Sequence, residues 1–244
     1  MSWLALLLAG LGLADLGHSL RPVRLLPETV AAVLTVALGL LAGLTAAGDV
    51  VALLVIAAIV IGWGVLVRQG FGRGRPQWPL ALLVLALAAA LLLAPLAGEG
   101  GGPVGDWLDA SPWWSGVDPD RALLVFGALL VQLSTGNVVV RLVLAVTGTI
   151  NPARPSHDAS VRLKGGRLLG PMERLVLVGL GLAGQLTAAS LVIAAKGLLR
   201  WPELQSFRTA TEGPTIDEVT EYFLLGSFLS WSVSLATLAL LVHR

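Results

Sequence analysis

Polar side chains inside long apolar stretches are the residues of this sequence that could do chemistry. Within 122–147, Ser134, Asn137 and Arg141 follow i, i+3, i+7 spacing, which places them on one face of a helix. An arginine near the middle of a membrane helix costs about 2.5–3.5 kcal/mol on insertion scales. We therefore expect Arg141 to pair or to form part of a functional site, with extension of its side chain to the membrane interface as the alternative.

Two later apolar stretches carry further charges at their ends. Lys196 ends one stretch and Glu221 begins the next, so an ion pair between them is expected, as is a pair of Arg141 with Asp15 or Glu173. Such residues either hold the last three helices together or form a pathway for a substrate or ion. The candidates for either role are Ser134, Asn137, Arg141, Gln185, Lys196 and Glu221.

Four residues are candidates at the inner face of the membrane: Asp15, His18, Glu173 and Arg174. Asp15 and His18 could act as an acid and base pair. No nucleophile or metal ligand stands beside them, and the sequence contains no HExxH, GxSxG or GxGD pattern. With no cysteine and three scattered histidines, the sequence predicts no metal and no cofactor. A lipid-modifying enzyme is a third hypothesis without a motif.

Composition decides the class of protein that positions these residues. Of the 244 residues, 56% are hydrophobic and 13% are charged, and the mean hydropathy of +0.84 is that of a membrane protein. A net charge of +1 gives no basis for nucleic-acid binding. We predict an all-α bundle of seven spans, at 3–17, 29–47, 50–68, 79–97, 122–147, 172–197 and 219–242.

The first and sixth predicted spans differ in how well their length fits a membrane. The first is short, so an interfacial or re-entrant helix is an alternative, and it has no preceding basic residue, so we expect a retained helix and not a signal peptide. The sixth has 21 uncharged residues between Arg174 and Lys196, enough to cross a bilayer core of about 30 Å. The helices divide into an N-terminal part, 1–121, and a C-terminal three-span part, 122–244.

The basic residues predict the orientation in the membrane. With the N-terminus outside and the C-terminus inside, eleven of the 16 Lys and Arg residues lie on the inner side and four on the outer. The inner loop 151–171 is the most basic region, and its Arg162, Lys164 and Arg167 are candidates for contact with anionic lipid headgroups, worth about 1 kcal/mol each. The seven spans and this orientation predict a multi-pass membrane protein.

The two outer loops carry other signals. The loop 99–120 has acidic residues, three tryptophans and no base, so we expect a segment along the membrane surface, with solvated turn acids favoured over a cation site. In the last outer loop, Thr215 and Glu218 have the spacing of a capping box that begins the seventh helix.

The C-terminal half also carries a family pattern. In order, the chain has Thr135-Gly136-Asn137 with Arg141, Gly166-Arg167-Leu168-Leu169-Gly170, Glu173-Arg174-Leu175, Gly184-Gln185, Ala194-Ala195-Lys196 and Glu221-Tyr222-Phe223-Leu224-Leu225-Gly226. Together these pieces resemble a family of bacterial multi-spanning membrane proteins classed as domain of unknown function 3307. The family's usual opening has a histidine before an Ala-Asp pair, whereas here His18 follows Asp15. The resemblance implies a bacterial inner-membrane protein and no particular chemistry.

The sequence thus leads to two main hypotheses about function. The first is a membrane protein that binds or moves a small ion or polar solute through a polar site among the last three helices. The second is a structural or accessory subunit in which the same residues hold helices together. Under either hypothesis, the expected partners of the protein are membrane lipids. Other membrane subunits or a second copy of the chain are further candidates.

Overall fold

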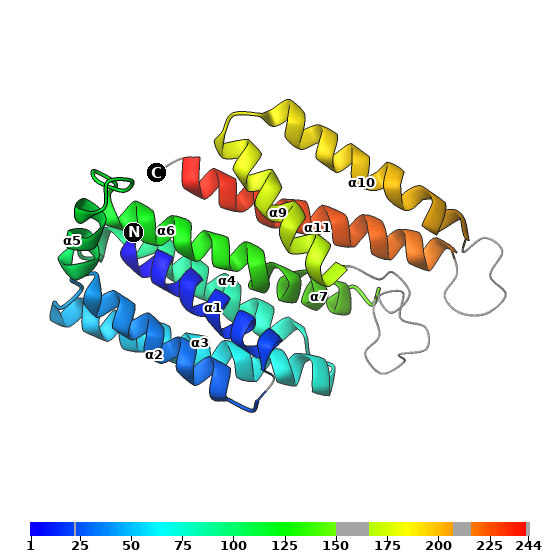
Figure 1. The fold of residues 1–244 in the computed structure, drawn as a ribbon. Helices are drawn as coiled ribbons and strands as arrows, with labels where there is room; N and C mark the ends of the chain where they lie inside the picture. Colours follow the sequence, from blue (N-terminus) through cyan, green and yellow to red (C-terminus); the bar gives the residue numbers. More distant parts are fainter. Residues whose placement is uncertain (22, 150–165, 207–215, 243–244) are drawn as a thin grey trace. The chain divides into compact units, whose positions relative to one another are not determined.

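The computed structural model describes residues 1–21, 23–149, 166–206 and 216–242, and this part consists of helices and the connections between them, with no strand (Figure 1). Four helices there are long and apolar enough to cross a membrane: Ser2–Leu20, Ala47–Arg73, Pro119–Val146 and Val219–Val242. Two shorter apolar helices are Leu26–Leu41 and Gln77–Leu92. The predicted all-α class is confirmed, and these helices are consistent with a membrane protein. The seven spans and their orientation stay predictions.

Contacts between residues divide the chain into two compact units. The N-terminal unit comprises Met1–Gln69 and Trp78–Thr135, and the C-terminal unit comprises Gly70–Gln77 and Gly136–His243. The helix Pro119–Val146 belongs to both, because the division falls between Thr135 and Gly136. Each unit is described by itself below.

Helix α1 (Ser2–Leu20) is the central helix of the N-terminal unit. It packs against α2 (Leu26–Leu41), α6 (Pro119–Leu130) and the π-helical turn η2 (Val131–Thr135). Most of its residues are buried, which explains why its sequence is apolar on all sides. A Cβ at Gly12 would lie 2.9 Å from the backbone of Leu130, so glycine permits the close approach.

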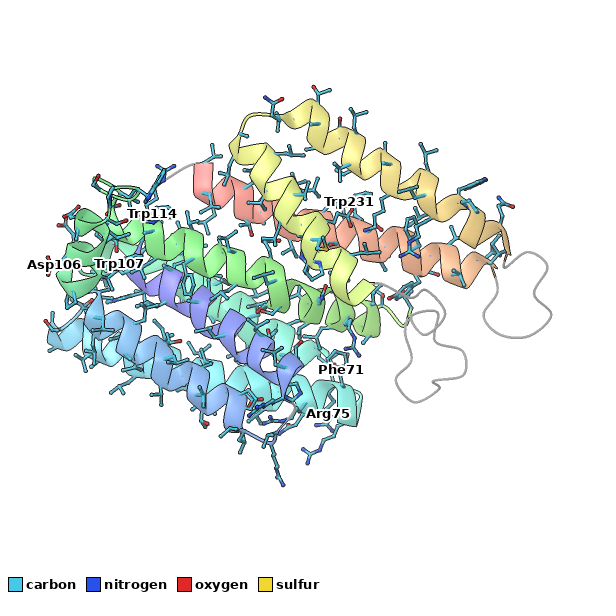
Figure 2. All side chains as sticks on the ribbon, in the orientation of Figure 1. Phe71, Arg75, Asp106, Trp107, Trp114 and Trp231 are labelled. Carbon is cyan, nitrogen blue, oxygen red and sulfur yellow. The ribbon has the colours of Figure 1, made fainter. Side chains whose placement is uncertain are left out.

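The other helices of this unit are α3 (Ala47–Arg73, as far as Gln69), α4 (Gln77–Leu92), the short η1 (Ala94–Leu96) and α5 (Gly102–Ala110). The segment from α5 to α6 is rich in acidic and aromatic residues. Its Trp107, within α5, and Trp114, after α5, lie at the end of the unit where α1 begins (Figure 1 and Figure 2). Both tryptophans are exposed, at 63% and 52%. Exposed tryptophans at the end of apolar helices are typical of a membrane interface.

The C-terminal unit is built from α7 (Gly136–Val146), α9 (Gly166–Leu182), α10 (Leu186–Ser206) and α11 (Ile216–Val242). Helix α11 packs against both α7 and α9, and α9 packs against α10 (Figure 1). Helices α9 and α10 follow each other as a hairpin whose connection is three residues long, Ala183 to Gln185.

This hairpin corrects the prediction of one continuous helix over 172–197. Gly184 has φ +71°, the Gln185 N–H donates to the Leu180 carbonyl at 2.8 Å, and the Gly184 N–H donates to the Gly181 carbonyl at 3.1 Å. These two bonds are the Schellman motif, which ends a helix at a glycine in the left-handed conformation. Hydropathy did not reveal the break because the residues on both sides are apolar.

Candidate functional site

Among the charged residues of the C-terminal unit whose side chains the structure describes, Arg174 on α9 is the most buried. Its side chain is 1% exposed, and its guanidinium donates from Nη2 to Asn137 Oδ1 at 3.0 Å and from Nη1 to Ser230 Oγ at 3.1 Å. We call Arg174, Asn137 and Ser230 the Arg174 cluster. It joins α7, α9 and α11 through hydrogen bonds to a charged donor, the stronger class of side-chain hydrogen bond.

Local sequence explains how a guanidinium fits between three helices. A Cβ at Gly136 would lie 2.8 Å from Arg174 Nε, so the glycine at the start of α7 makes room for the arginine. On α11, Ser227, Ser230 and Ser234 are all buried and spaced by three and four residues, so they form one polar stripe on the face that α9 and α7 cover. The sequence predicts Arg174 only as a residue of the inner membrane face and gives no sign that it contacts this stripe.

A second set of polar contacts, the Glu173 cluster, comprises Glu173, Lys196 and Trp231. Lys196 Nζ lies 2.5 Å from Glu173 Oε2, and the Trp231 indole N–H donates to Glu173 Oε1 at 2.8 Å. Lys196 Nζ also lies 5.6 Å from the centre of the Trp231 ring, within the range of a cation–π contact. Figure 2 labels Trp231 on α11. The cluster therefore joins α9, α10 and α11.

The expected ion pair of Lys196 with Glu221 is wrong, because Lys196 pairs with Glu173. Glu221 is exposed and accepts a hydrogen bond from Thr149 Oγ1 at 3.4 Å. The physical reason is the hairpin, since a helix that folds back at Gly184 brings its two ends together, whereas a straight helix would separate them by about 35 Å.

Arg141 and Gln185 also lie elsewhere than expected. Arg141 is exposed, with its guanidinium carbon 4.9 Å from the centre of the Phe71 ring, and it pairs with neither Glu173 nor Asp15 in the described contacts. Gln185 is exposed in the turn between α9 and α10. The π-helical turn before α7 shifts the rotational register between Ser134 and Arg141, so the spacing of an ordinary helix misplaces them.

In the N-terminal unit, Ser134 is buried and donates to the Gly12 carbonyl at 2.7 Å and to the Leu130 carbonyl at 2.9 Å. The bond to Gly12 joins η2 to α1. Ser134 therefore takes part in packing of the N-terminal unit. Of the three residues predicted to share one helix face, Ser134, Asn137 and Arg141, it is Asn137 that accepts a hydrogen bond from the charged side chain of Arg174.

The inner-face candidates Asp15 and His18 lie beside two residues that the sequence analysis did not select, Glu28 and Arg68. Arg68 Nη1 donates to Glu28 Oε1 at 2.6 Å, and His18 Nδ1 lies 3.9 Å from the same oxygen. The Trp63 indole N–H is 3.1 Å from both Asp15 oxygens. Arg68 and Glu28 sit within apolar sequence 40 residues apart, so only the packing of α2 on α3 could reveal the pair.

Acidic residues at the other end of the N-terminal unit make closed contacts. Asp49 Oδ1 accepts from the Trp3 indole at 2.8 Å and from the Gly98 N–H at 3.0 Å. Asp118 caps α6 by accepting from the Asp120 N–H at 3.2 Å, which is the role of a turn acid.

Several predicted residues lie outside the described part of the structure. They are Arg162, Lys164, the side chain of Arg167, Thr215 and the side chain of Glu218. Their assignments to lipid headgroups and to a capping box stay predictions.

Among the described residues, no group of three or more His, Cys, Asp or Glu side chains is arranged to hold a metal ion. Comparison with protein-family models, with curated proteins and with solved structures found no match.

Proposed function

We propose that this chain is a structural or accessory subunit of a protein assembly in the bacterial inner (plasma) membrane. It has several membrane-crossing helices and no transport activity of its own. The resemblance to the domain of unknown function 3307 supports the bacterial membrane setting and stays a prediction. Membrane lipids surround the helices, and other membrane subunits or a second copy of the chain are the proposed partners. The rival proposal is binding or movement of a small ion or polar solute among the last three helices.

One observation carries this proposal: the Arg174 cluster is closed. Arg174 is 1% exposed while it donates to Asn137 and Ser230, so the three side chains satisfy one another across α7, α9 and α11. A site for a solute needs polar groups that a solute can reach. The residues of the predicted site that are exposed, Arg141, Gln185 and Glu221, belong to neither cluster.

Labelling with a water-soluble thiol reagent tests the proposal, and the absence of native cysteine makes every introduced thiol unique. We expect Ser230→Cys, and Ser227→Cys on the same stripe, to resist a small methanethiosulfonate in the folded protein and to react after denaturation in SDS. Trp113→Cys, at a position 88% exposed, is the positive control and reacts in both states. Rapid labelling of the two serine positions in the folded protein would overturn the proposal in favour of a solute pathway.

The hairpin also bears on how the chain crosses the membrane. We propose that α9 and α10 enter and leave on one side, because the contact of Glu173 with Lys196 sets the two ends of the hairpin at the same level. Lys196, Arg200 and Arg208 then move to the inner side and Arg244 to the outer side. This places thirteen of the 16 Lys and Arg residues inside and two outside, a stronger bias than the eleven and four of the seven-span arrangement.

A further inference from the structure

The N-terminal unit contains three buried polar atoms that make no hydrogen bond within the described part of the chain. They are Glu28 Oε2, Thr135 Oγ1 and His18 Nδ1. Buried polar groups are satisfied in native structures in about 90% or more of cases, so each exception needs an explanation such as an ion or a water molecule. All three atoms belong to one region, the end of α1 where Asp15 lies.

These atoms belong to side chains that neighbour Asp15 or Glu28. Asp15 lies beside the Thr135 hydroxyl and close enough to Glu28 for the charge of Glu28 to act on it. Glu28 Oε1 in turn is 3.9 Å from His18 Nδ1. The side chains come from α1, the start of α2 and the π-helical turn η2. We call Asp15, His18, Glu28 and Thr135, with Arg68, the Asp15 cluster.

Charge indicates what the cluster can accept. Asp15 and Glu28 contribute two carboxylates, whereas Arg68 contributes one guanidinium, which is committed to Glu28 Oε1 at 2.6 Å. Glu28 is 2% exposed, so water does not screen its charge fully. With His18 uncharged, one further positive charge would balance the set; a protonated His18, whose Nδ1 lies 3.9 Å from Glu28 Oε1, would supply that charge instead. The carbonyl end of α1 lies next to His18 and favours a cation by its dipole.

The ligand chemistry is that of a hard cation. The open positions are a carboxylate oxygen and a hydroxyl oxygen, and oxygen atoms are the ligands that hard cations prefer. No set of three metal-ligating side chains is present among the described residues, which disfavours a divalent metal. Thr135 lies in a π-helical turn, and such turns occur frequently at functional sites.

We propose that the Asp15 cluster is a binding site for a small monovalent cation, held by Glu28 Oε2, the Thr135 hydroxyl and the Asp15 carboxylate. The site lies in the N-terminal unit, so it is separate from the Arg174 cluster and independent of the structural role proposed for it. Arg68 holds Glu28 in place and leaves its second oxygen for the ion.

Thermal unfolding of the purified full chain in detergent tests the proposal. At constant ionic strength and pH, choline chloride is replaced stepwise by sodium chloride, and in parallel by ammonium chloride. For the wild type we expect a saturable rise in Tm with at least one of the two ions, of roughly 2–4 °C when the ion is about fivefold above its Kd. Choline is too large for the site and gives no rise.

Two variants and one matched control locate the effect. Glu28→Gln keeps an oxygen for Arg68 but removes the charge, and Thr135→Val removes the hydroxyl at nearly constant volume; both should lose the rise. Asp49→Asn is the control, because Asp49 is also buried beside a tryptophan but its Oδ1 already accepts from Trp3 and Gly98. It should keep the rise.

Three results would overturn the proposal: no saturable rise in the wild type, an equal rise in all variants, or a Tm that responds to pH but to neither ion. The last would indicate a shared proton instead of a bound cation. If Glu28→Gln does not fold, Thr135→Val decides alone, and circular dichroism and gel filtration establish which variants are folded.

Discussion

Removal of the Ser230 hydroxyl is the sharpest perturbation of the Arg174 cluster, because it deletes one acceptor and leaves the buried charge in place. Arg174 Nη1 donates to Ser230 Oγ at 3.1 Å, and Ser230 is 5% exposed. Hydrogen bonds between membrane helices contribute about 0.6 kcal/mol on average and up to about 1.7 kcal/mol. The charged donor places this bond at the upper end, so we expect Ser230→Ala to lower the free energy of unfolding by about 1–2 kcal/mol.

Ser232→Ala on the same helix is the matched control. The Ser232 hydroxyl donates to the Phe228 carbonyl of its own helix at 2.9 Å, so its loss should change the free energy by less than about 0.5 kcal/mol. Reversible unfolding in mixed detergent and SDS micelles measures both. In Asn137→Ala with Ser230→Ala, the two effects should not add, because both residues bind one guanidinium. Equal losses for Ser230→Ala and Ser232→Ala would refute the inferred role of the Arg174 cluster.

Two further predictions concern the hairpin. In intact cells, Leu199→Cys should stay unlabelled by an impermeant maleimide added outside, like the inner control Arg75→Cys and unlike the outer control Trp113→Cys; labelling of Leu199→Cys would restore a sixth span. Gly184→Ala should lower stability by about 1–2 kcal/mol because φ is +71°, whereas Gly179→Ala, in a helix with equally open space, should raise it by about 0.5–1 kcal/mol. Unfolding in SDS measures both, and effects of the same sign would contradict the Schellman motif.

Hydropathy sufficed to predict which stretches are helical, because long apolar runs leave the backbone few alternatives in a membrane. It did not predict where the sixth helix ends. Gly184 stands in a run of apolar and small residues, and only its left-handed backbone distinguishes it from Gly179, which continues the helix. Amino-acid composition does not distinguish these two backbone conformations of glycine. Gly184 itself was the available signal, since glycine is the residue that most often takes the left-handed conformation at the end of a helix.

The choice between the two arginines could not be made from spacing. Arg141 stands in the middle of an apolar stretch and Arg174 at the edge of one, yet Arg141 is exposed and Arg174 is buried. Two tertiary features reverse the expectation: the π-helical turn changes the register of α7, and Gly136 leaves space that the Arg174 side chain fills. Local charge patterns therefore identified the polar residues of the C-terminal unit but not their partners.

Two aspartates of the N-terminal unit show why unsatisfied atoms are a better guide to a site than charge is. Asp49 and Asp15 each accept from a tryptophan indole, Trp3 and Trp63 respectively. Asp49 has a backbone N–H as its second donor, so that end of the unit is complete without a ligand. Asp15 has instead the Thr135 hydroxyl and a second carboxylate nearby, and Glu28 Oε2 of that carboxylate is buried without a partner among the described residues. If cation binding follows Glu28 and Thr135 but ignores Asp49, the unsatisfied atoms mark the site; if all buried acids respond alike, burial of charge alone accounts for the result.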